Sequence, residues 1–352
     1  AQGWIGIEMS YLPSVFIIIV NYNGWKDTIE CLESLQNVTY PNYRIIVVDN
    51  NSTNSSLEYI KKWCIGSIKV SSNFVKYNTD NKPVFYIEYD SETAKSGGTK
   101  EKEGYIAGIA PNRSLVLIKS EKNLGFSGGN NIGIRYSLNR NAEYILLLNN
   151  DTVVTCDFIE RLVEAAESND RVGAVGGKIF YYNKPNTIAF AGGRIDEIRG
   201  NGHHFTDDRF RRPSPVTFLT GCSLLIKAEV FDQVGLLDEY YFLYVEDLDF
   251  CFRVQKHGYS LVYVPDSIIY HKEGSSTGRL SPLSLYYSSR NRPYFVHKNV
   301  EKHFKVILFW MFYIPTRLLR SIQYGKKGRY IIKGIVDFVV FKIRNYFPSK
   351  TS

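Results

Sequence analysis

Apolar and polar stretches alternate along the first sixty residues at strand and helix spacing. The β-branched run Val15–Val20 predicts a buried strand, and Arg44–Val48 predicts a second one. Between them, Asp27–Leu35 carries apolar residues at helical spacing behind a capping-box pair, and residues 55–63 begin a second helix with a similar pair. The order strand, helix, strand, helix, with polar residues at each strand exit, predicts a doubly wound α/β sheet.

The stretch Tyr144–Val154 is the centre of this pattern. Five apolar or aromatic residues precede Asn149, Asn150 and Asp151. A continuous apolar run is typical of a strand buried on both faces of a parallel sheet. Asp151 then lies at a strand exit, where open α/β sheets bind ligands, and a carboxylate there suits a metal ion or a phosphate held through one. Taken alone, the same three residues are better explained as a polar turn.

The segment Ser67–Asn112 interrupts the alternation. It contains strand-like pieces at Phe74–Tyr77 and Val84–Tyr89, followed by the charged, glycine-bearing run Ser91–Gly104. Connections this long inside a compact domain are usually functional flaps or mobile insertions. We predict an insertion over residues 67–112 that forms a surface excursion.

A glycine-rich turn follows the next predicted strand, Ser114–Lys119. The turn, residues 123–131, has glycines that permit close backbone approach, and the helix predicted over Ile132–Leu138 offers its N-terminal NH groups to an anion. The turn has neither the dinucleotide-binding glycine fingerprint nor a P-loop lysine, so by itself it indicates little.

The second half places an aromatic run directly before Glu246 and Asp247. These two carboxylates open a helix that is predicted to end near Gly258. Taken alone, they are better explained as acidic residues that favour a helix N-terminus. Two further strands are predicted at Val262–Val264 and Ser267–His271, while the adjacent histidines 203 and 204 are expected to be solvated.

Positive charge is concentrated at the end of the chain. The protein has 352 residues, with 43 Lys and Arg against 35 Asp and Glu, and 14 of those basic residues but only 2 of the acidic ones follow Ser289. The apolar segment Phe304–Ile314 is too short to span a bilayer as a helix. Lysine and arginine interleaved with apolar residues are typical of a helix lying on an anionic membrane. The alternative is packing against the rest of the fold or a second subunit, as in a homodimer. The basic residues of the linker that follows the apolar segment are Arg317, Arg320, Lys326, Lys327 and Arg329.

The cysteines and the N-terminus add less. Five scattered cysteines without a CxxC pair favour reduced thiols and a cytosolic setting over a disulfide framework or a zinc site. Ala1–Glu8 has neither a basic segment nor a long apolar run, so we interpret it as a cloning remnant rather than a signal peptide. Nothing outside the basic tail favours a nucleic-acid partner.

Seven short motifs occur in an order that resembles the family 2 glycosyltransferases of the GT-A fold, most closely their rhamnosyltransferase-like branch. The motifs are VNYNG, VVDNNS, NLGFSGGNN, LLLNNDT, TGCSLLIK, EDLDFCFR and IIYHKEGSS. Each is weak alone, but the ordered set is specific. The resemblance covers residues 14–292 apart from the insertion. It implies a GT-A catalytic domain with a mostly parallel, Rossmann-like sheet at 14–292. Residues 1–13 are then a lead-in, and the charge and apolar pattern described above predicts a basic, amphipathic, helical, membrane-associating region at 293–352.

The resemblance also implies roles for individual residues. Asn149-Asn150-Asp151 corresponds to the DXD motif, with Asn at its first position, and Asp151 and His271 are the implied ligands of Mg²⁺ or Mn²⁺. Asp247 is the implied catalytic base, with Glu246 beside it. Thr220, Gly221, Phe242 and Tyr244 would form the acceptor and sugar wall. The residues expected to bind the nucleotide-sugar are Asn21, Asn23, Asp49, Asn51, Asn123, Gly125, Asn130 and Asn150.

These expectations combine into one functional hypothesis. The chain would be an inverting, metal-dependent glycosyltransferase that uses dTDP-rhamnose or a UDP-sugar and acts on a glycan or lipid-linked acceptor at the cytoplasmic face of the cell membrane. A different class, a catalytically idle GT-A-like binding module, is motivated by the Asn at the first DXD position. A dehydrogenase is disfavoured because no GxGxxG follows the first strand.

Overall fold

Five parallel strands form the N-terminal half of the main sheet. The computed structural model describes residues 11–272 and 280–346. The strands are β1 (Val15–Asn21), β2 (Tyr43–Asp49), β3 (Phe85–Asp90), β4 (Ser114–Lys119) and β5 (Tyr144–Leu148). They lie in the spatial order β3-β4-β2-β1-β5, so their carboxyl ends share one edge of the sheet.

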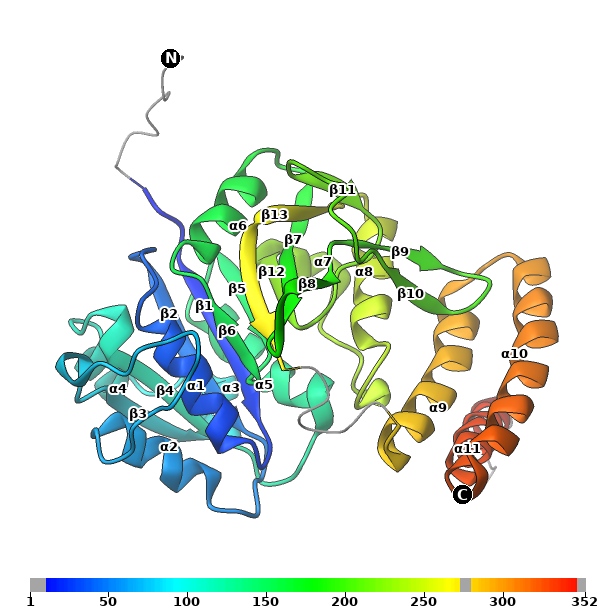
Figure 1. Ribbon diagram of the computed structural model, residues 1–352, viewed down its shortest axis with the longest axis horizontal. Coiled ribbons are helices and arrows are strands. Elements are labelled where there is room, and N and C mark those ends of the chain that lie inside the picture. The colour runs from blue at the N-terminus through cyan, green and yellow to red at the C-terminus, as the bar shows by residue number, and fades with distance from the viewer. Residues whose placement is uncertain (1–10, 273–279, 347–352) are drawn as a thin grey trace.

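The sheet continues into a mixed C-terminal half (Figure 1). Its strands are β6 (Thr152–Val154), β7 (Val172–Tyr181), β8 (Lys184–Phe190), β11 (Ser214–Val216), β12 (Ser223–Lys227) and β13 (Ser260–His271), while β9 (Gly193–Asp196) and β10 (Asn201–His204) form a separate pair. Strand β12 runs antiparallel between β5 and β7, and β13 pairs parallel with β7 and antiparallel with β6. The two strands predicted over residues 262–271 are one strand with a register shift between Val264 and Ile268.

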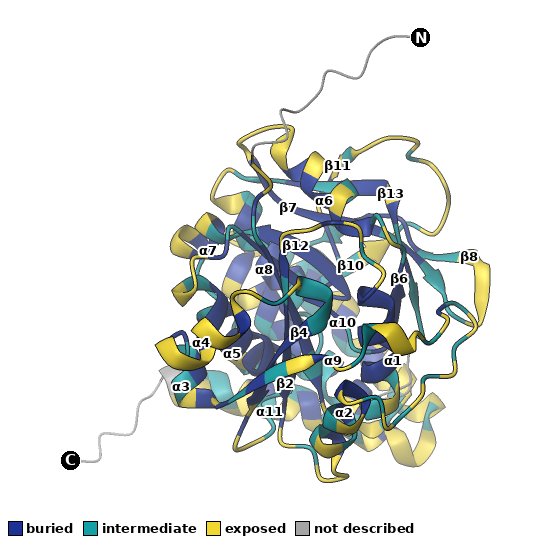
Figure 2. Ribbon diagram, turned by 90° about the vertical axis from the view of Figure 1, so that its left-hand side faces the viewer, coloured by how far each residue is buried: buried dark blue, intermediate teal, exposed yellow. Residues whose placement is uncertain are grey.

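Helices flank the sheet, and this explains its unbroken apolar runs. All five residues of β5 are buried, as predicted. Figure 2 shows the buried strands inside a layer whose outer surface is exposed. The flanking helices are α1 (Trp25–Leu35), α2 (Ser56–Cys64), α3 (Ser91–Lys95), α4 (Lys100–Ile106), α5 (Gly125–Asn139), α6 (Phe158–Glu167), α7 (Ala228–Val234) and α8 (Glu246–Lys256), and the 3-10 turns are η1 (Thr79–Asn81), η2 (Pro111–Arg113), η3 (Glu239–Tyr241) and η4 (Gly325–Lys327).

The segment 67–112 is more than a surface excursion, which corrects the prediction. Phe74–Tyr77 forms no strand, but β3 pairs with β4 at the sheet edge and α3 and α4 follow it. Glu103 of the charged run is buried, with an ion pair to Arg44 at 2.5 Å and a hydrogen bond from the Tyr136 hydroxyl at 2.7 Å. The sequence pattern places these charges in solvent, but in the structure they bind the segment to the core.

Neither predicted capping box forms. Gly24 is the N-cap of α1, and the carboxylates of Asp27 and Glu30 each lie 2.5 Å from the Lys272 ammonium. Ser55 precedes α2 with a left-handed φ of 58° and no side-chain cap bond. The α1 carboxylates therefore bind Lys272, a partner that is distant in sequence and that the local pattern cannot reveal.

Three helices at one end of the molecule complete the fold: α9 (Pro282–Asn299), α10 (His303–Gln323) and α11 (Gly328–Tyr346) (Figure 1). The predicted domain boundary at 292/293 falls inside α9. Helix α10 continues through Pro315 instead of ending there, and the Thr316 hydroxyl donates to the Phe312 carbonyl at 2.8 Å in the turn around it. None of the described helices is long and apolar enough to cross a membrane.

Candidate active site

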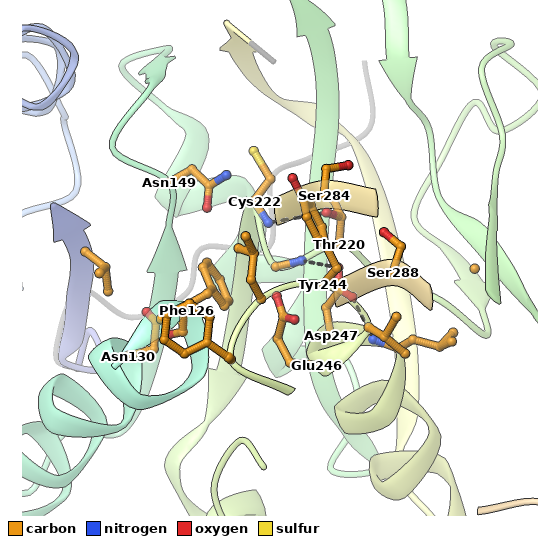
Figure 3. Close-up of a pocket in the computed structure, with 18 of the residues that line it drawn as sticks. Phe126, Asn130, Asn149, Thr220, Cys222, Tyr244, Glu246, Asp247, Ser284 and Ser288 are labelled. Atoms are coloured by element: carbon orange, nitrogen blue, oxygen red, sulfur yellow. Dashed lines mark hydrogen bonds between the residues drawn. The ribbon is translucent and has the colours of Figure 1, made fainter. Parts of the chain in front are cut away.

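A cavity of about 600 Å³ opens at the carboxyl ends of β1 and β5, within the size range of small-molecule sites. Figure 3 shows Asn149 on one side of this cavity and Ser284 and Ser288 of α9 on the other, with Glu246 and Asp247 between them. The cavity therefore lies where open α/β sheets bind ligands, and α9 supplies a wall that the strand pattern did not predict.

Asp151 and His271 meet in this cavity, and their part in metal binding stays a prediction. Strand β13 pairs with β6 so that His271 lies opposite Thr152, next to Asp151. The His271 Nε2 atom is 3.1 Å from Asp151 Oδ1, and both side chains are largely buried. Burial alone lowers the pKa of His271, but the Cys222 sulfur and the Asp151 carboxylate outweigh it and hold that pKa well above its usual value.

The two asparagines before Asp151 face different neighbours. Both side chains border the cavity, but the Asn150 amide donates to the Thr28 hydroxyl at 3.0 Å, which ties it to α1. Asn149 NH donates to the Cys222 carbonyl at 2.9 Å, so this turn is fastened to the strand beside it. Asn149, which we did not predict as a ligand-binding residue, is the one shown facing the cavity in Figure 3.

Four of the eight predicted nucleotide-binding residues lie beside the cavity and do not line it. The Asn21 amide donates to Asp49 Oδ1 at 2.8 Å, and both residues are buried. Asn23 Oδ1 accepts from Thr53 NH at 2.8 Å, while Asn51 is exposed. These polar side chains hold the β1 and β2 exits together, and their part in nucleotide binding stays a prediction.

The other half of the predicted nucleotide site, Asn123, Gly125, Asn130 and Asn150, does line the cavity. Asn50, absent from the predicted set, organises the glycine-rich turn: its amide donates to Asn123 Oδ1 at 3.1 Å and to the Gly125 carbonyl at 2.9 Å. Asn50 could have been predicted from the sequence, because it directly follows Asp49 at the end of a predicted strand.

The glycine-rich turn is itself helical. Helix α5 begins at Gly125, not at Ile132 as predicted. A β-carbon on Gly129 would come within 2.8 Å of Val20, and one on Gly133 within 2.6 Å of Ile18. These glycines therefore let α5 lie directly on β1, and the helix can start at the cavity. Gly125 itself has a φ of 68°, and a β-carbon there would collide with the Phe242 carbonyl oxygen.

The aromatic segment before the acid pair has a strained backbone. Phe242, Tyr244 and Val245 have φ angles of 59°, 68° and 76°, which are costly for bulky and β-branched residues. Asn291 of α9 is fully buried, and its amide donates to the carbonyls of Tyr241, Leu243 and Tyr244 at 2.7–2.8 Å. The tertiary contact with α9 therefore holds the segment that delivers Glu246.

Glu246 and Asp247 project into the cavity from the first turn of α8. Asp247 Oδ2 accepts from Gly221 NH at 3.1 Å and Oδ1 from Leu248 NH at 2.8 Å. Burial raises the pKa of Asp247, and these two NH groups offset part of that rise. Glu246 Oε2 is buried without a hydrogen-bond partner, and burial together with the neighbouring Asp247 charge raises its pKa well above the usual value. Of the two carboxyl groups, Glu246 is therefore the one that holds a proton more readily.

The residues predicted to form a sugar-facing wall lie together, and their contact with a sugar stays a prediction. Thr220, Gly221, Phe242 and Tyr244 all line the cavity. The Phe242 ring stacks on Tyr287 of α9, with centroids 4.9 Å apart. An apolar wall fixed in this way gives a flat surface against which a sugar ring can pack.

Two further contributors were missed by sequence reasoning. Ser284, Ser288 and Arg292 recur every four residues on α9 and all border the cavity; this helical spacing was the available signal. His204, expected to be solvated, is exposed but also borders the cavity and stacks on Phe218.

The residues fit a divalent cation that is shared with a substrate. Within residues 11–272 and 280–346, no set of three or more His, Cys, Asp or Glu residues is placed to hold a metal ion. Asp151 and His271 nevertheless present one carboxylate and one imidazole to the same cavity. Mg²⁺ and Mn²⁺ sites that complete their shell with substrate phosphates and water need no more than one or two protein ligands.

Solved structures with the same architecture place the chain in a fold class. It superposes with a TM-score of 0.53 on residues 1–349 of S. aureus TarS, covering 93% of this chain and 80% of that one at 14% identity. A mannosyltransferase from Pyrobaculum calidifontis, solved with GDP-Man and Mn²⁺, gives a TM-score of 0.50 over 97% of this chain and 89% of its own at 12% identity. The fold is that of the GT-A glycosyltransferases.

Sequence profiles identify the family. The profile described as "Glycosyl transferase family group 2" matches residues 144–325, and that of "Glycosyl transferase family 2" matches residues 16–82. Because the first match covers more than half of the protein, the chain belongs to the family 2 glycosyltransferases, as the motifs indicated.

Three curated relatives share parts of the chain. A hexosyltransferase of low-salt glycan biosynthesis from Haloferax volcanii is 25% identical over 81% of this chain and 76% of its own length. A dTDP-rhamnosyl transferase from Shigella flexneri is 28% identical over 54% of this chain and 66% of its own. An N-acetylglucosaminyl-diphospho-decaprenol L-rhamnosyltransferase from Mycobacterium tuberculosis is 32% identical over 42% of this chain and 53% of its own.

Proposed function

We propose that this chain is an inverting, divalent-cation-dependent glycosyltransferase. It moves a sugar from dTDP-rhamnose or a UDP-sugar to a hydroxyl of a glycan or lipid-linked acceptor, in the synthesis of a cell-surface polysaccharide or glycoconjugate. The observation that carries the proposal is a single cavity that holds the Asp151–His271 pair and the Glu246–Asp247 pair. The names of the Shigella and mycobacterial relatives support rhamnose as the sugar, and the latter supports a lipid-linked acceptor.

In this proposal Asp247 is the catalytic base. An acceptor hydroxyl is a poor nucleophile near neutral pH, so a carboxylate must accept its proton during attack. Asp247 has its two oxygens oriented by the NH groups of Gly221 and Leu248 and borders the cavity. The acceptor oxygen then bonds to the anomeric carbon as the bond to the diphosphate breaks, and the diphosphate leaves with the electron pair. One displacement from the opposite face inverts the anomeric centre.

Asp151 and His271 are the proposed protein ligands of the cation. When bound, a divalent cation offsets the charge that builds on the diphosphate leaving group. The mannosyltransferase solved with GDP-Man and Mn²⁺ supports this role for a GT-A fold. Asn123, Gly125, Asn130 and Asn150, which line the cavity, would bind the rest of the donor, and Asn50 holds the turn that carries Asn123 and Gly125.

A donor panel tests the proposal directly. The full chain is incubated with dTDP-rhamnose and with UDP- and GDP-sugars, with Mn²⁺, with Mg²⁺ or with EDTA, and release of the nucleoside diphosphate is measured. We expect slow hydrolysis of one donor that requires the cation. Nucleotide binding without turnover on any donor or acceptor extract would instead support the idle binding module, which Asn149 at the first DXD position motivates.

We also propose that α10 lies on the cytoplasmic face of an anionic membrane. Ile307, Met311 and Ile322 are each at least 60% exposed and share one face of α10. Lys326, Lys327 and other basic residues of the tail lie close to this apolar face in the sequence. Arg317, predicted among those lipid-facing cations, is buried instead. Each lysine or arginine near an anionic leaflet contributes about 1 kcal/mol, and buried apolar side chains add a part that salt does not screen.

Substitution of the exposed face tests membrane binding. We expect the parent to co-sediment with phosphatidylglycerol vesicles and weakly with phosphatidylcholine vesicles, and raised salt to weaken binding without abolishing it. Met311→Glu combined with Ile322→Glu should remove most of this binding, whereas Ile65→Glu, at an equally exposed site directly after α2, should not. If the double variant keeps its liposome binding but converts a dimer to a monomer in sedimentation, the face is a subunit interface.

A further inference from the structure

Three arginines, Arg292, Arg317 and Arg320, cluster between α9 and α10 without an acidic partner. Burial, and then the Arg292 and Arg320 charges, lower the pKa of Arg317 to about 10, and burial followed by Arg320 lowers that of Arg292. In the described part of the chain, the groups that oppose these effects are the tyrosines 313 and 324, and no carboxylate forms an ion pair with any of the three. Positive charge has therefore been collected here without a counter-charge.

The cluster is held in place by packing. Arg317 is 8% exposed, its Nε atom has no hydrogen-bond partner, and its guanidinium lies 5.1 Å from the centre of the Tyr313 ring. The Tyr313 hydroxyl donates to the Ser289 carbonyl of α9 at 2.8 Å, which locks α10 to α9. Arg317 is the buried member of the cluster, whereas Arg292 is half-buried and Arg320 is exposed. Burying a cation such as Arg317 without a partner is unfavourable unless an anion compensates it.

Arg292 connects this cluster to the active-site cavity. It borders the cavity together with Ser288, one helical turn earlier on α9, and Ser284, two turns earlier. Ser284 and Ser288 lie across the cavity from Asn149, on the side of Asp247 (Figure 3), and Arg292 borders the same cavity. A ligand held by Arg292 would therefore share the cavity with the proposed base.

We propose that Arg292, supported by Arg317 and Arg320, binds the diphosphate of a lipid-diphosphate-linked acceptor. Guanidinium groups recognise phosphate oxygens through pairs of parallel hydrogen bonds, and serine hydroxyls can add donors to the same group. Leu283 of α9 is exposed and borders the same cavity, so a lipid chain leaving the cavity meets an apolar side chain. The inference rests on the proposed glycosyl transfer, since it names the residues that hold that reaction's acceptor.

Farnesyl diphosphate, farnesol and inorganic diphosphate test this site by calorimetry on the full chain. The titrations contain EDTA, because binding at the donor site would require the cation. We expect farnesyl diphosphate to bind, farnesol and inorganic diphosphate to bind much more weakly, and Arg292→Gln to weaken farnesyl diphosphate binding about 10-fold or more. Arg292→Lys, which keeps the charge and loses the planar fork, should lie between them. Arg211→Gln, at an exposed arginine that does not border the cavity, is the matched control and should bind like the parent.

Several outcomes would overturn the inference. Equal binding by Arg292→Gln and the parent would remove the site, and farnesol binding as tight as that of farnesyl diphosphate would leave only an apolar contact. Inorganic diphosphate binding as tightly as farnesyl diphosphate would indicate a free-phosphate site. A loss confined to Mn²⁺-dependent dTDP binding would assign Arg292 to the donor. If the donor panel fails while Arg292-dependent binding persists, glycosyl transfer is wrong and the anion site stands; the reverse result removes this site alone.

Discussion

Asp247→Asn is expected to lower turnover about 10²-fold or more while donor affinity stays nearly unchanged. Asparagine keeps the shape of the side chain, and its carbonyl oxygen can still accept one of the two backbone NH groups that now orient Asp247. What is lost is the ability to take a proton from the acceptor. Single-turnover kinetics with the donor identified by the panel, together with donor binding measured by calorimetry, would separate chemistry from binding.

Glu246→Gln is the matched control for this substitution. Glu246 Oε2 has no hydrogen-bond partner and its pKa is raised, so a neutral amide should resemble its protonated form and cost much less. Equal and modest losses from the two variants would reassign both carboxylates to the N-terminus of α8.

The pH profile gives a second measure of the same base. Because burial raises the pKa of Asp247, the base loses its charge at a higher pH than an exposed aspartate does. Turnover should therefore fall as the pH drops through that raised value, and the residual rate of Asp247→Asn should lack this acidic limb.

Asp151→Ala is expected to abolish Mn²⁺-dependent nucleotide binding, and His271→Ala to weaken it about 10-fold or more. With Asn149 in place of a first acidic residue, Asp151 is the one carboxylate of the turn, and His271 Nε2 lies 3.1 Å from it. Loss of either group removes one of the two protein ligands proposed for the cation. Calorimetry of nucleotide binding with Mn²⁺ and with EDTA measures the cation-dependent part.

His203→Ala is the control for the imidazole, because His203 is exposed and does not border the cavity. If His271→Ala binds nucleotide and Mn²⁺ like the parent, His271 does not belong to the metal shell. If Asp151→Ala also binds like the parent, cation dependence itself is wrong for this chain.

Much of the fold was readable from local pattern. β5 was predicted because an apolar run of this length has no polar face to turn to water, and all its residues are buried. The end of α8 near Gly258 was also predicted, because glycine commonly follows a helix C-terminus. Gly258 indeed adopts a φ of 88°, which favours glycine. The start of α5 was missed, because glycines that usually break helices here serve close packing against Ile18 and Val20. β3 was predicted as a strand piece, but its place in the sheet depends on pairing with β4.

By itself, the sequence determined the strand exits, the polar residues at them and the ordered motifs that place the chain in its family, because these depend on neighbours within a few residues. Only the tertiary structure decided which of those residues meet. The β6–β13 register brings His271 to Asp151 across 120 positions, and Asn291 of α9 holds the strained backbone before Glu246. Such contacts depend on how distant elements pack, and the residues next to a side chain in the sequence do not identify its distant partner. For that reason it was the structure alone that brought Ser284, Ser288 and Arg292 of α9 to the border of the cavity and showed that Arg317 of the predicted tail is buried.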